Sequence, residues 1–166
     1  KAKEHHAEAF EILETEPKSI ELAKLYEDMA RMHLLRTGDV VKALSWAEKA
    51  LDLAKELNAQ EVVADSYATL GNILYETGDL NKSIEYLERA LKIALENNYV
   101  ETAIESYFSL VPALPSEEYE RGAEYQEKGY ELAKKAGAIS LQSSFGTHIS
   151  LWDISKSKAF IEESVA

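Results

Sequence analysis

A period of forty residues constrains the fold of this chain more than any other feature of its sequence. The run Thr37-Gly38-Asp39 returns as Thr77-Gly78-Asp79. The same offset relates Glu48 to Glu88, Ala50-Leu51 to Ala90-Leu91, Ala54 to Ala94, Asn58 to Asn98 and Ser66-Tyr67 to Ser106-Tyr107. Unrelated segments would not keep one offset over such a length. Self-similarity at this period indicates stacked structural units, each burying the apolar face of its neighbour.

Each unit is predicted to contain two amphipathic helices joined by a short turn. Apolar residues recur at helical spacing on both sides of the turn: Val63, Tyr67, Leu70 and Leu74 before it, and Ile84, Leu87, Leu91 and Leu95 after it. Gly78 can adopt the left-handed conformation that ends a helix, and Asp79 can cap the next one. Because such short connections make neighbouring helices antiparallel, the sequence predicts an all-α array of antiparallel helix pairs.

The predicted array occupies the whole chain, residues 1–166, as a single domain and a piece of a longer polypeptide. We expect a lone second helix at residues 3–14 and units at about 19–58, 60–98, 100–137 and 139–164. Pro112 and Pro115 should end the first helix of the third unit early. Ser116-Glu117-Glu118 should then cap a helix that runs to Ala136 and stops at Gly137.

Charged residues are numerous and mostly acidic. Thirty Asp and Glu against 18 Lys and Arg give a formal net charge of −12, which argues against nucleic acid and against an anionic membrane surface as partners. Outward charges at i,i+4 spacing should pair along the helices: Glu85 with Arg89, Glu88 with Lys92, Glu124 with Lys128, and Glu131 with Lys135. The chain has no cysteine, so it has neither a disulfide nor a thiolate metal site, which fits the cytoplasm.

The run from Leu70-Gly71 through Gly78-Asp79 and Ser83 to Ala90-Leu91 closely resembles the tetratricopeptide repeat. The resemblance implies a right-handed α-α superhelix in which Leu-Gly lets two helices approach closely. The preceding unit keeps Gly38-Asp39, Ala43 and Ala50-Leu51, with Ala30-Arg31 where Leu-Gly is expected. The third unit departs most, with Leu110-Val111, no Gly-Asp turn, and Gly129-Tyr130 in place of Ala-Leu. The resemblance is strong from about residue 20 to 98.

The forty-residue unit is longer than the usual tetratricopeptide period of about 34 residues. It is similar to the extended units found behind the ATPase cores of signal-transducing transcription activators and of cyclase-linked ATPases, and in bacterial peptide-pheromone receptors. This likeness implies a regulatory protein in which the array senses or recruits a partner.

Catalytic, cofactor and metal sites are not predicted, so the chain is expected not to be an enzyme. His5-His6 lacks the i,i+4 spacing of helical metal ligands. His33 and His148 are interpreted as packed or partly exposed side chains. The aromatic residues Trp46, Tyr86 and Tyr125 fall at matching places in successive second helices, which favours packing over a cofactor site.

A partner is expected along the concave groove that the first helices of tetratricopeptide units form. The groove-facing spacing of the family gives these candidate residues: Leu25, Asp28, Met32, Leu35, Arg36, Asp65, Ala68, Asn72, Tyr75, Glu76, Glu105 and Phe108, with Asp153 from the last pair. Acids outnumber bases among them, so a segment carrying Lys or Arg and an apolar anchor would fit. An alternative interpretation is that these acids only reflect the acidic composition and that the groove is empty or filled by flanking sequence.

The carboxylate clamp of chaperone-binding relatives is disfavoured, because only Asn72 matches it and Asp28, Asp65 and Glu105 would repel a terminal carboxylate. The leading hypothesis is a protein-interaction or scaffold module of a cytoplasmic regulatory protein. The alternative is a sensor domain in which a peptide or small effector occupies the groove. Flanking domains of the parent chain, or a second copy, are further expected partners because the array has open ends.

Overall fold

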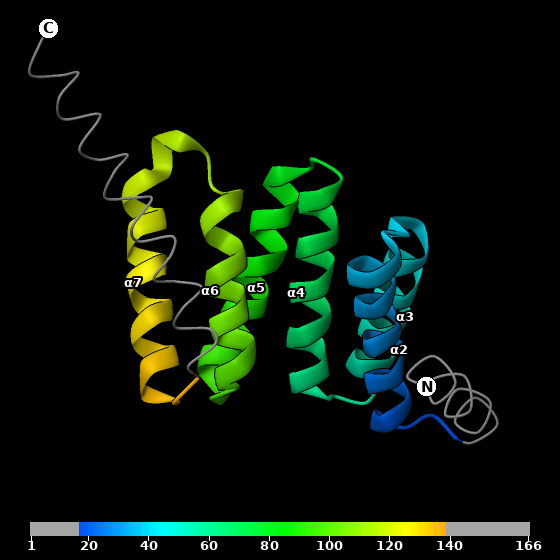
Figure 1. The fold of residues 1–166 in the computed structure, drawn as a ribbon. Helices are drawn as coiled ribbons and strands as arrows, with labels where there is room; N and C mark the ends of the chain where they lie inside the picture. Colours follow the sequence, from blue (N-terminus) through cyan, green and yellow to red (C-terminus); the bar gives the residue numbers. More distant parts are fainter. Residues whose placement is uncertain (1–16, 139–166) are drawn as a thin grey trace, which may run out of the picture.

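The computed structural model describes residues 17–138, and every regular element in that range is helical. In chain order these are α2 (Ile20–Met32), the π-helix η1 (His33–Thr37), α3 (Val40–Glu56), α4 (Gln60–Glu76), α5 (Leu80–Asn97), α6 (Val100–Ala113), the 3-10 helix η2 (Ser116–Glu118) and α7 (Tyr119–Lys135). Successive helices run antiparallel and stack side by side, as Figure 1 shows. The predicted all-α solenoid of antiparallel helix pairs is confirmed.

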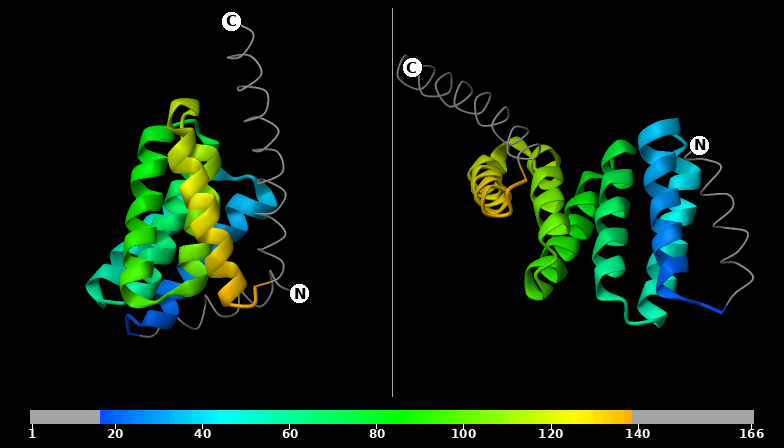
Figure 2. Two further views of the ribbon diagram at one scale, coloured as in Figure 1. Left: turned by 90° about the vertical axis from the view of Figure 1, so that its left-hand side faces the viewer. Right: turned by 60° about the horizontal axis from the view of Figure 1, so that its bottom comes forward.

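Three helix pairs follow one another along the solenoid: α2 with α3, α4 with α5, and α6 with α7. The first helices also contact one another, because α4 packs against both α2 and α6. They thus form a continuous layer with α4 in its middle, while α3 and α5 connect consecutive pairs (Figure 2). We call the exposed side of the α2–α4–α6 layer the inner face.

The turns within the first two pairs form as predicted. Gly38 has a φ of 63° and Gly78 a φ of 84°, the left-handed region where glycine has no steric penalty. Asp39 accepts a hydrogen bond from the backbone N–H of Lys42, and Asp79 from that of Lys82. These caps satisfy backbone donors that the start of a helix leaves without a partner.

Gly71 sets the distance between α4 and α5. A Cβ atom at this position would lie 2.6 Å from Cγ of Leu87 and 3.2 Å from its backbone nitrogen. Leu87 itself has no exposed surface, so its side chain fills the space that the missing Cβ leaves. The Leu-Gly pair therefore acts in this chain as the resemblance implies.

The first pair contains one extra residue, which the turn-based alignment of the sequence missed. Tyr26 packs against Trp46 with tilted rings and centroids 5.4 Å apart, and Tyr67 stacks on Tyr86 at 5.6 Å. The two second-helix rings are 40 positions apart, whereas Tyr26 and Tyr67 are 41 apart. The π-helix His33–Thr37 accommodates the added residue, because each π turn takes in one residue more than an α turn.

The expectation that Ala30-Arg31 replaces Leu-Gly is therefore wrong by one position. Met29-Ala30 takes that place, and Ala30 is the small residue equivalent to Gly71. Ala30 and Ala47, the latter at the position of Leu87, are both fully buried in one core cluster. Two small side chains thus replace the Gly-and-Leu combination of the second pair.

The aromatic stripe predicted to serve packing does so in all three pairs. The third pair repeats the contact, with Tyr107 and Tyr125 5.7 Å apart. Each pair thus holds one ring from its first helix against one from its second.

The third pair is shorter, as its prolines predicted. Helix α6 has 14 residues against 17 in α4 and ends one residue after Pro112. Ser116–Glu118 forms a 3-10 turn, not the predicted cap, since α7 begins at Tyr119 without a side-chain cap. The helix runs to Lys135, one residue short of the prediction, and Gly137 follows with a φ of 69°.

Two of the four predicted i,i+4 ion pairs are present. Glu85 pairs with Arg89 at 2.6 Å, and Glu124 with Lys128 at 2.5 Å. Glu88 does not pair with Lys92: it accepts from Arg121 and from the hydroxyl of Tyr125, which tie α5 to α7. Glu131 pairs with Lys134 at i,i+3 spacing, at 4.0 Å, and does not form the predicted pair with Lys135. A partner on a neighbouring helix outcompetes one on the same helix when the packing brings it close.

Candidate functional site

The predicted groove residues divide by burial. Leu25 and Ala68 are only 6% and 5% exposed and belong to the interior, so they offer a partner no surface. The other ten are exposed or half-buried: Asp28, Met32, Leu35, Arg36, Asp65, Asn72, Tyr75, Glu76, Glu105 and Phe108. Asp153 lies outside the described residues, as do His5, His6 and His148.

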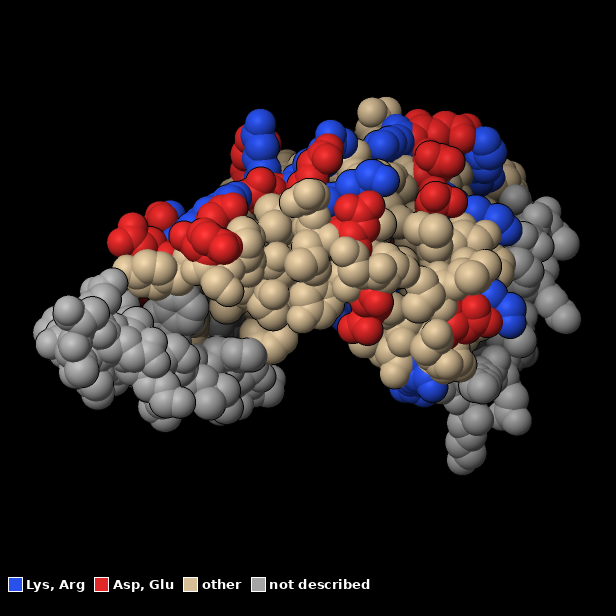
Figure 3. Space-filling model, turned by 90° about the horizontal axis from the view of Figure 1, so that it is seen from above, with Lys and Arg blue, Asp and Glu red and all other residues tan. Residues whose placement is uncertain are grey.

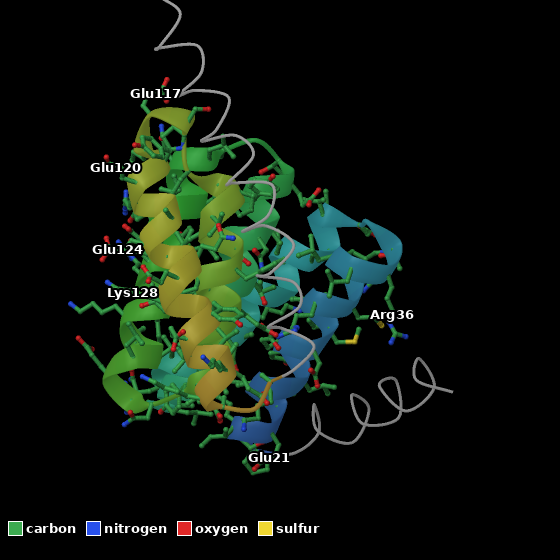
Figure 4. All side chains as sticks on the ribbon, turned by 60° about the vertical axis from the view of Figure 1, so that its left-hand side comes forward. Glu21, Arg36, Glu117, Glu120, Glu124 and Lys128 are labelled. Carbon is green, nitrogen blue, oxygen red and sulfur yellow. The ribbon has the colours of Figure 1, made fainter. Side chains whose placement is uncertain are left out.

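The residues at the turn end of the first pair stand out from the fold. Leu35 is 74% exposed, and Arg36 extends away from the ribbon beside it, as Figure 4 shows. Both belong to the π-helix. His33, in the same element, is half-buried and lies 3.4 Å from the Thr37 hydroxyl through Nδ1, which agrees with its interpretation as a partly exposed side chain.

A polar cavity of about 310 Å³ opens where α2, α4 and α6 meet. Its lining consists of four carboxylates, one guanidinium and a short stretch around the start of α6: Arg31, Glu61, Asp65, Asn98, Tyr99, Val100, Glu101, Thr102 and Glu105. Asp65 and Glu105, both predicted from the groove spacing, are brought together here. The remaining predicted groove residues do not line the cavity.

Hydrogen bonds between an acid and a threonine join consecutive first helices. The Thr69 hydroxyl on α4 donates to Glu27 on α2 at 2.7 Å, and the Thr102 hydroxyl on α6 donates to Asp65 on α4 at 2.6 Å. Both acids are removed from water to different degrees, since Glu27 is 7% exposed and Asp65 is half-buried. Each of these hydrogen bonds therefore places a carboxyl group between two repeats.

Burial controls the titration of these two acids. It raises the pKa of Glu27 to about 7, although the hydrogen bond from Thr69 and the charge of Arg31 act in the opposite direction. Burial also raises the pKa of Asp65, against the lowering effect of the Thr102 hydroxyl. Glu27 and Asp65 thus have limited access to water, which strengthens their interaction with a cation that reaches them.

Two basic residues of α2 form ion pairs with acids of the inner face. Arg31 reaches Glu105 with both terminal nitrogens, at 3.2 and 3.3 Å. Lys24 lies 2.9 Å from Glu61. Among residues 17–138, no ion pair involves Asp28 or Glu101. The inner face therefore carries more negative than positive charge even after Arg31 and Lys24 have formed their ion pairs.

The distribution of charge differs between parts of the surface. Seen from above, most charged side chains gather along one side, and uncharged residues form a continuous area with a few acidic and basic groups in it (Figure 3). On α7, Glu120, Glu124 and Lys128 project outward from the fold (Figure 4). Acids and bases are mixed there, which is typical of a solvated helix surface.

The sequence contained a signal for the acids that the groove prediction omitted. Glu61 and Glu101 lie one helical turn before Asp65 and Glu105, on the same side of α4 and α6, and are themselves forty residues apart. Extending the repeat comparison by one turn would have found them. Glu27, Arg31 and Thr102 had no such signal, because they do not recur at the repeat period.

None of the helices in residues 17–138 combines the length and the apolarity that a membrane span requires. In the same range, no three His, Asp or Glu side chains are grouped as ligands of a metal ion.

Comparison with known proteins places the chain by fold. BtubC (BKLC) from P. vanneervenii, known from its crystal structure, is similar with a TM-score of 0.75 at 22% sequence identity. The match covers 93% of this chain and 64% of that one, so this chain spans less than two thirds of its relative. No curated protein matches the chain. The family model for the tetratricopeptide repeat matches residues 21–96, which contain the first two helix pairs. The first two helix pairs therefore match the tetratricopeptide repeat family.

Proposed function

We propose that this chain is a protein-interaction module that binds a basic segment of a partner protein along its inner face. Tetratricopeptide repeats generally mediate interactions between proteins. The observation that carries the proposal is the cavity between α2, α4 and α6, in which four carboxylates meet one guanidinium.

A Lys or Arg side chain suits this cavity on electrostatic grounds. A cation that enters meets carboxylates from two helices at once, and at the half-buried Asp65 partial exclusion of water makes the interaction stronger than it would be on an open surface. An acidic or phosphorylated segment would instead be repelled, which gives the surface its selectivity. Glu101 supports this assignment because no internal base among the described residues pairs with it.

Apolar anchors are available on the same face. Met32 and Phe108 are half-buried, and Tyr75 is 38% exposed. Anchors of this kind provide binding energy by leaving water, while the charges select the partner and its orientation. We therefore favour a segment in which a basic residue and an apolar residue occur close together, as part of a regulatory protein.

A sensor of a small cationic effector or short peptide is the second candidate. The cavity volume of about 310 Å³ lies at the lower end of the range for small-molecule sites. A sensor would bind such an effector with the isolated chain, whereas a scaffold would require a longer segment.

Fluorescence anisotropy with labelled peptides tests the proposal. The probes are a peptide in which Arg and Leu alternate with Ala, and the same peptide with Glu in place of Arg. The test variant neutralises three cavity acids and leaves Glu105 in place: Glu61→Gln, Asp65→Asn and Glu101→Gln. The matched control neutralises three exposed acids of the second helices: Glu48→Gln, Asp52→Asn and Glu127→Gln.

We expect the Arg peptide to bind the wild type and the Glu peptide not to bind. The cavity variant should bind the Arg peptide about tenfold more weakly, a loss of about 1.4 kcal/mol, while the control retains affinity. Equal weakening in both variants would assign the effect to overall charge. That result, or failure of the Arg peptide to bind the wild type, would refute the proposed site.

A further inference from the structure

The ion pair between Arg31 and Glu105 spans the inner face from the first repeat to the third. Arg31 lies near the end of α2 and Glu105 in the first half of α6, 74 positions later in the chain. Helix α4 lies between these two helices (Figure 1). Both terminal nitrogens of the guanidinium face both carboxylate oxygens, the two-pronged geometry that orients an Arg–carboxylate pair.

Arg31 lines the cavity and pairs with one of its carboxylates, as a partner's arginine would. Its guanidinium contributes to the lining together with the four carboxylates. The charges of Glu105, Glu27 and Asp65 raise the pKa of Arg31, although burial opposes them. The surrounding acids thus already hold one guanidinium, which comes from the chain itself.

The pair can be broken without great loss of stability. The side chains of Arg31 and Glu105 are each 41% exposed, so water screens their attraction. Glu105 released from Arg31 can receive another cation, and Arg31 released from Glu105 still lies near Glu27 and Asp65. Exchange of an internal cation for an external one therefore keeps Glu105 paired and leaves Arg31 under the electrostatic influence of Glu27 and Asp65.

We propose that the Arg31–Glu105 pair is an autoinhibitory clasp that a basic partner residue opens by taking the place of Arg31 at Glu105. This inference rests on the proposed function, since it specifies how binding at the same surface is regulated. Because the clasp joins the first repeat to the third, its opening also releases a constraint on the curvature of the solenoid. Binding and change of shape are then coupled through one ion pair.

Removing the clasp should strengthen binding. Arg31→Ala is compared with Lys92→Ala, which removes an equal charge from an exposed side chain of α5 that makes no ion pair with Glu105. Both variants make the chain more acidic, so general attraction for a basic peptide rises equally. We expect Arg31→Ala to bind the Arg-containing peptide about fivefold more tightly than Lys92→Ala does, because it alone removes the internal competitor. Arg31→Gln, which keeps the aliphatic stem, serves as a second variant if Arg31→Ala fails to fold.

A distance measurement without ligand separates the clasp from the proposed function. The chain has no cysteine, so Ser45→Cys and Glu127→Cys, at exposed positions of α3 and α7, allow specific spin labelling. Double electron–electron resonance should show that Arg31→Ala shifts or broadens the distance between first and third repeats, and that the Arg peptide produces the same shift in the wild type.

The outcomes discriminate between the two ideas. Failure of the peptide to bind the wild type refutes the proposed function and, with it, the autoinhibitory role. Binding that is equal in Arg31→Ala and Lys92→Ala refutes the clasp and leaves the proposed function standing. An unchanged label distance in Arg31→Ala likewise shows that the ion pair does not constrain the solenoid, and overturns the coupling to shape.

Discussion

Replacing Glu27 by Gln should make the stability of this protein nearly independent of pH around neutrality. The Glu27 side chain lies between α2 and α4, is 7% exposed and accepts a hydrogen bond from Thr69. The charged groups that face it are Arg31 and Asp28 on its own helix and Asp65 on α4. Burial dominates among these influences and raises the pKa of Glu27 from 4.5 to about 7.

The sign of the effect follows from proton binding. Between about pH 4.5 and 7 the folded protein holds a proton on Glu27 that the unfolded chain has released. The free energy of unfolding therefore falls as pH rises through this window, and the loss is complete above the folded-state pKa. A shift of about 2.5 units at 1.36 kcal/mol per unit sets an upper bound of about 3.4 kcal/mol. We expect an observed change of about 1–3 kcal/mol, because structural relaxation and water entry reduce it.

Glu27→Gln removes the ionisation but keeps an oxygen that can accept from Thr69. At about pH 8 the variant should be more stable than the wild type by about 1–3 kcal/mol, and near pH 5 the two should be similar. Urea unfolding followed by circular dichroism across this range measures the difference. Glu21→Gln, an exposed position on the same helix, is the matched control and should keep the wild-type slope. A wild type whose stability does not fall with pH, or a Gln variant that retains the fall, would refute the reasoning.

Three further changes test the packing of the repeats. Gly71→Ala should lower the free energy of unfolding by about 1–3 kcal/mol, because the new Cβ would clash with Leu87. The loss should be smaller in a Leu87→Ala background, which removes the clashing side chain. If chemical denaturation gives additive losses for the two changes, the two residues do not clash. Ala90→Phe should be destabilising by about 1–3 kcal/mol, since Ala90 has no exposed surface, and an unchanged melting temperature would contradict its interior position. Deleting Leu35, the 74% exposed residue of the π-helix, should convert that turn to α-helix with little loss of stability, whereas a large fall in melting temperature would argue against the one-residue insertion.

Most of the fold could be predicted because its determinants are local and repeated. Gly78 and Asp79 specify the turn by backbone conformation and capping, and Gly71 specifies the close approach of two helices. Each of these signals acts over a few residues, so the sequence displays it directly. Because these signals recur after forty residues, they predict a repeated arrangement of helix pairs.

The π-helix could not be found by the same route. Aligning the first two units on their Gly-Asp turns gives the offset of the second helices, and that offset hides an extra residue upstream of the first turn. The aromatic positions Tyr26, Tyr67 and Tyr107 would have exposed it, because their spacing changes from 41 to 40. Without the ring contacts there was no reason to prefer that alignment over the one through the turns.

The site was predicted only in part, because side chains reach across repeats by distances that sequence spacing does not give. Helical spacing assigned Asp65 and Glu105 to one groove, and both line the cavity between the first helices. The turn-based alignment matched Arg31 with Gly71, one residue away from its true register. The direction in which the Arg31 side chain points could therefore not be inferred. Its partner lies two repeats further along, and only the superhelical arrangement of α2, α4 and α6 brings the two together.

The Trp46 ring in the first pair gives that repeat its own fluorescent probe. The sequence has two tryptophans, and Trp46 is the one within the described residues, packed on Tyr26 with Lys49 4.3 Å above its ring centre. The equivalent positions of the other two pairs hold tyrosines. In a Trp152→Phe background, tryptophan emission would therefore report on the first pair alone, while circular dichroism follows every helix. Comparing the two signals would reveal whether the solenoid melts as a whole or loses one end first.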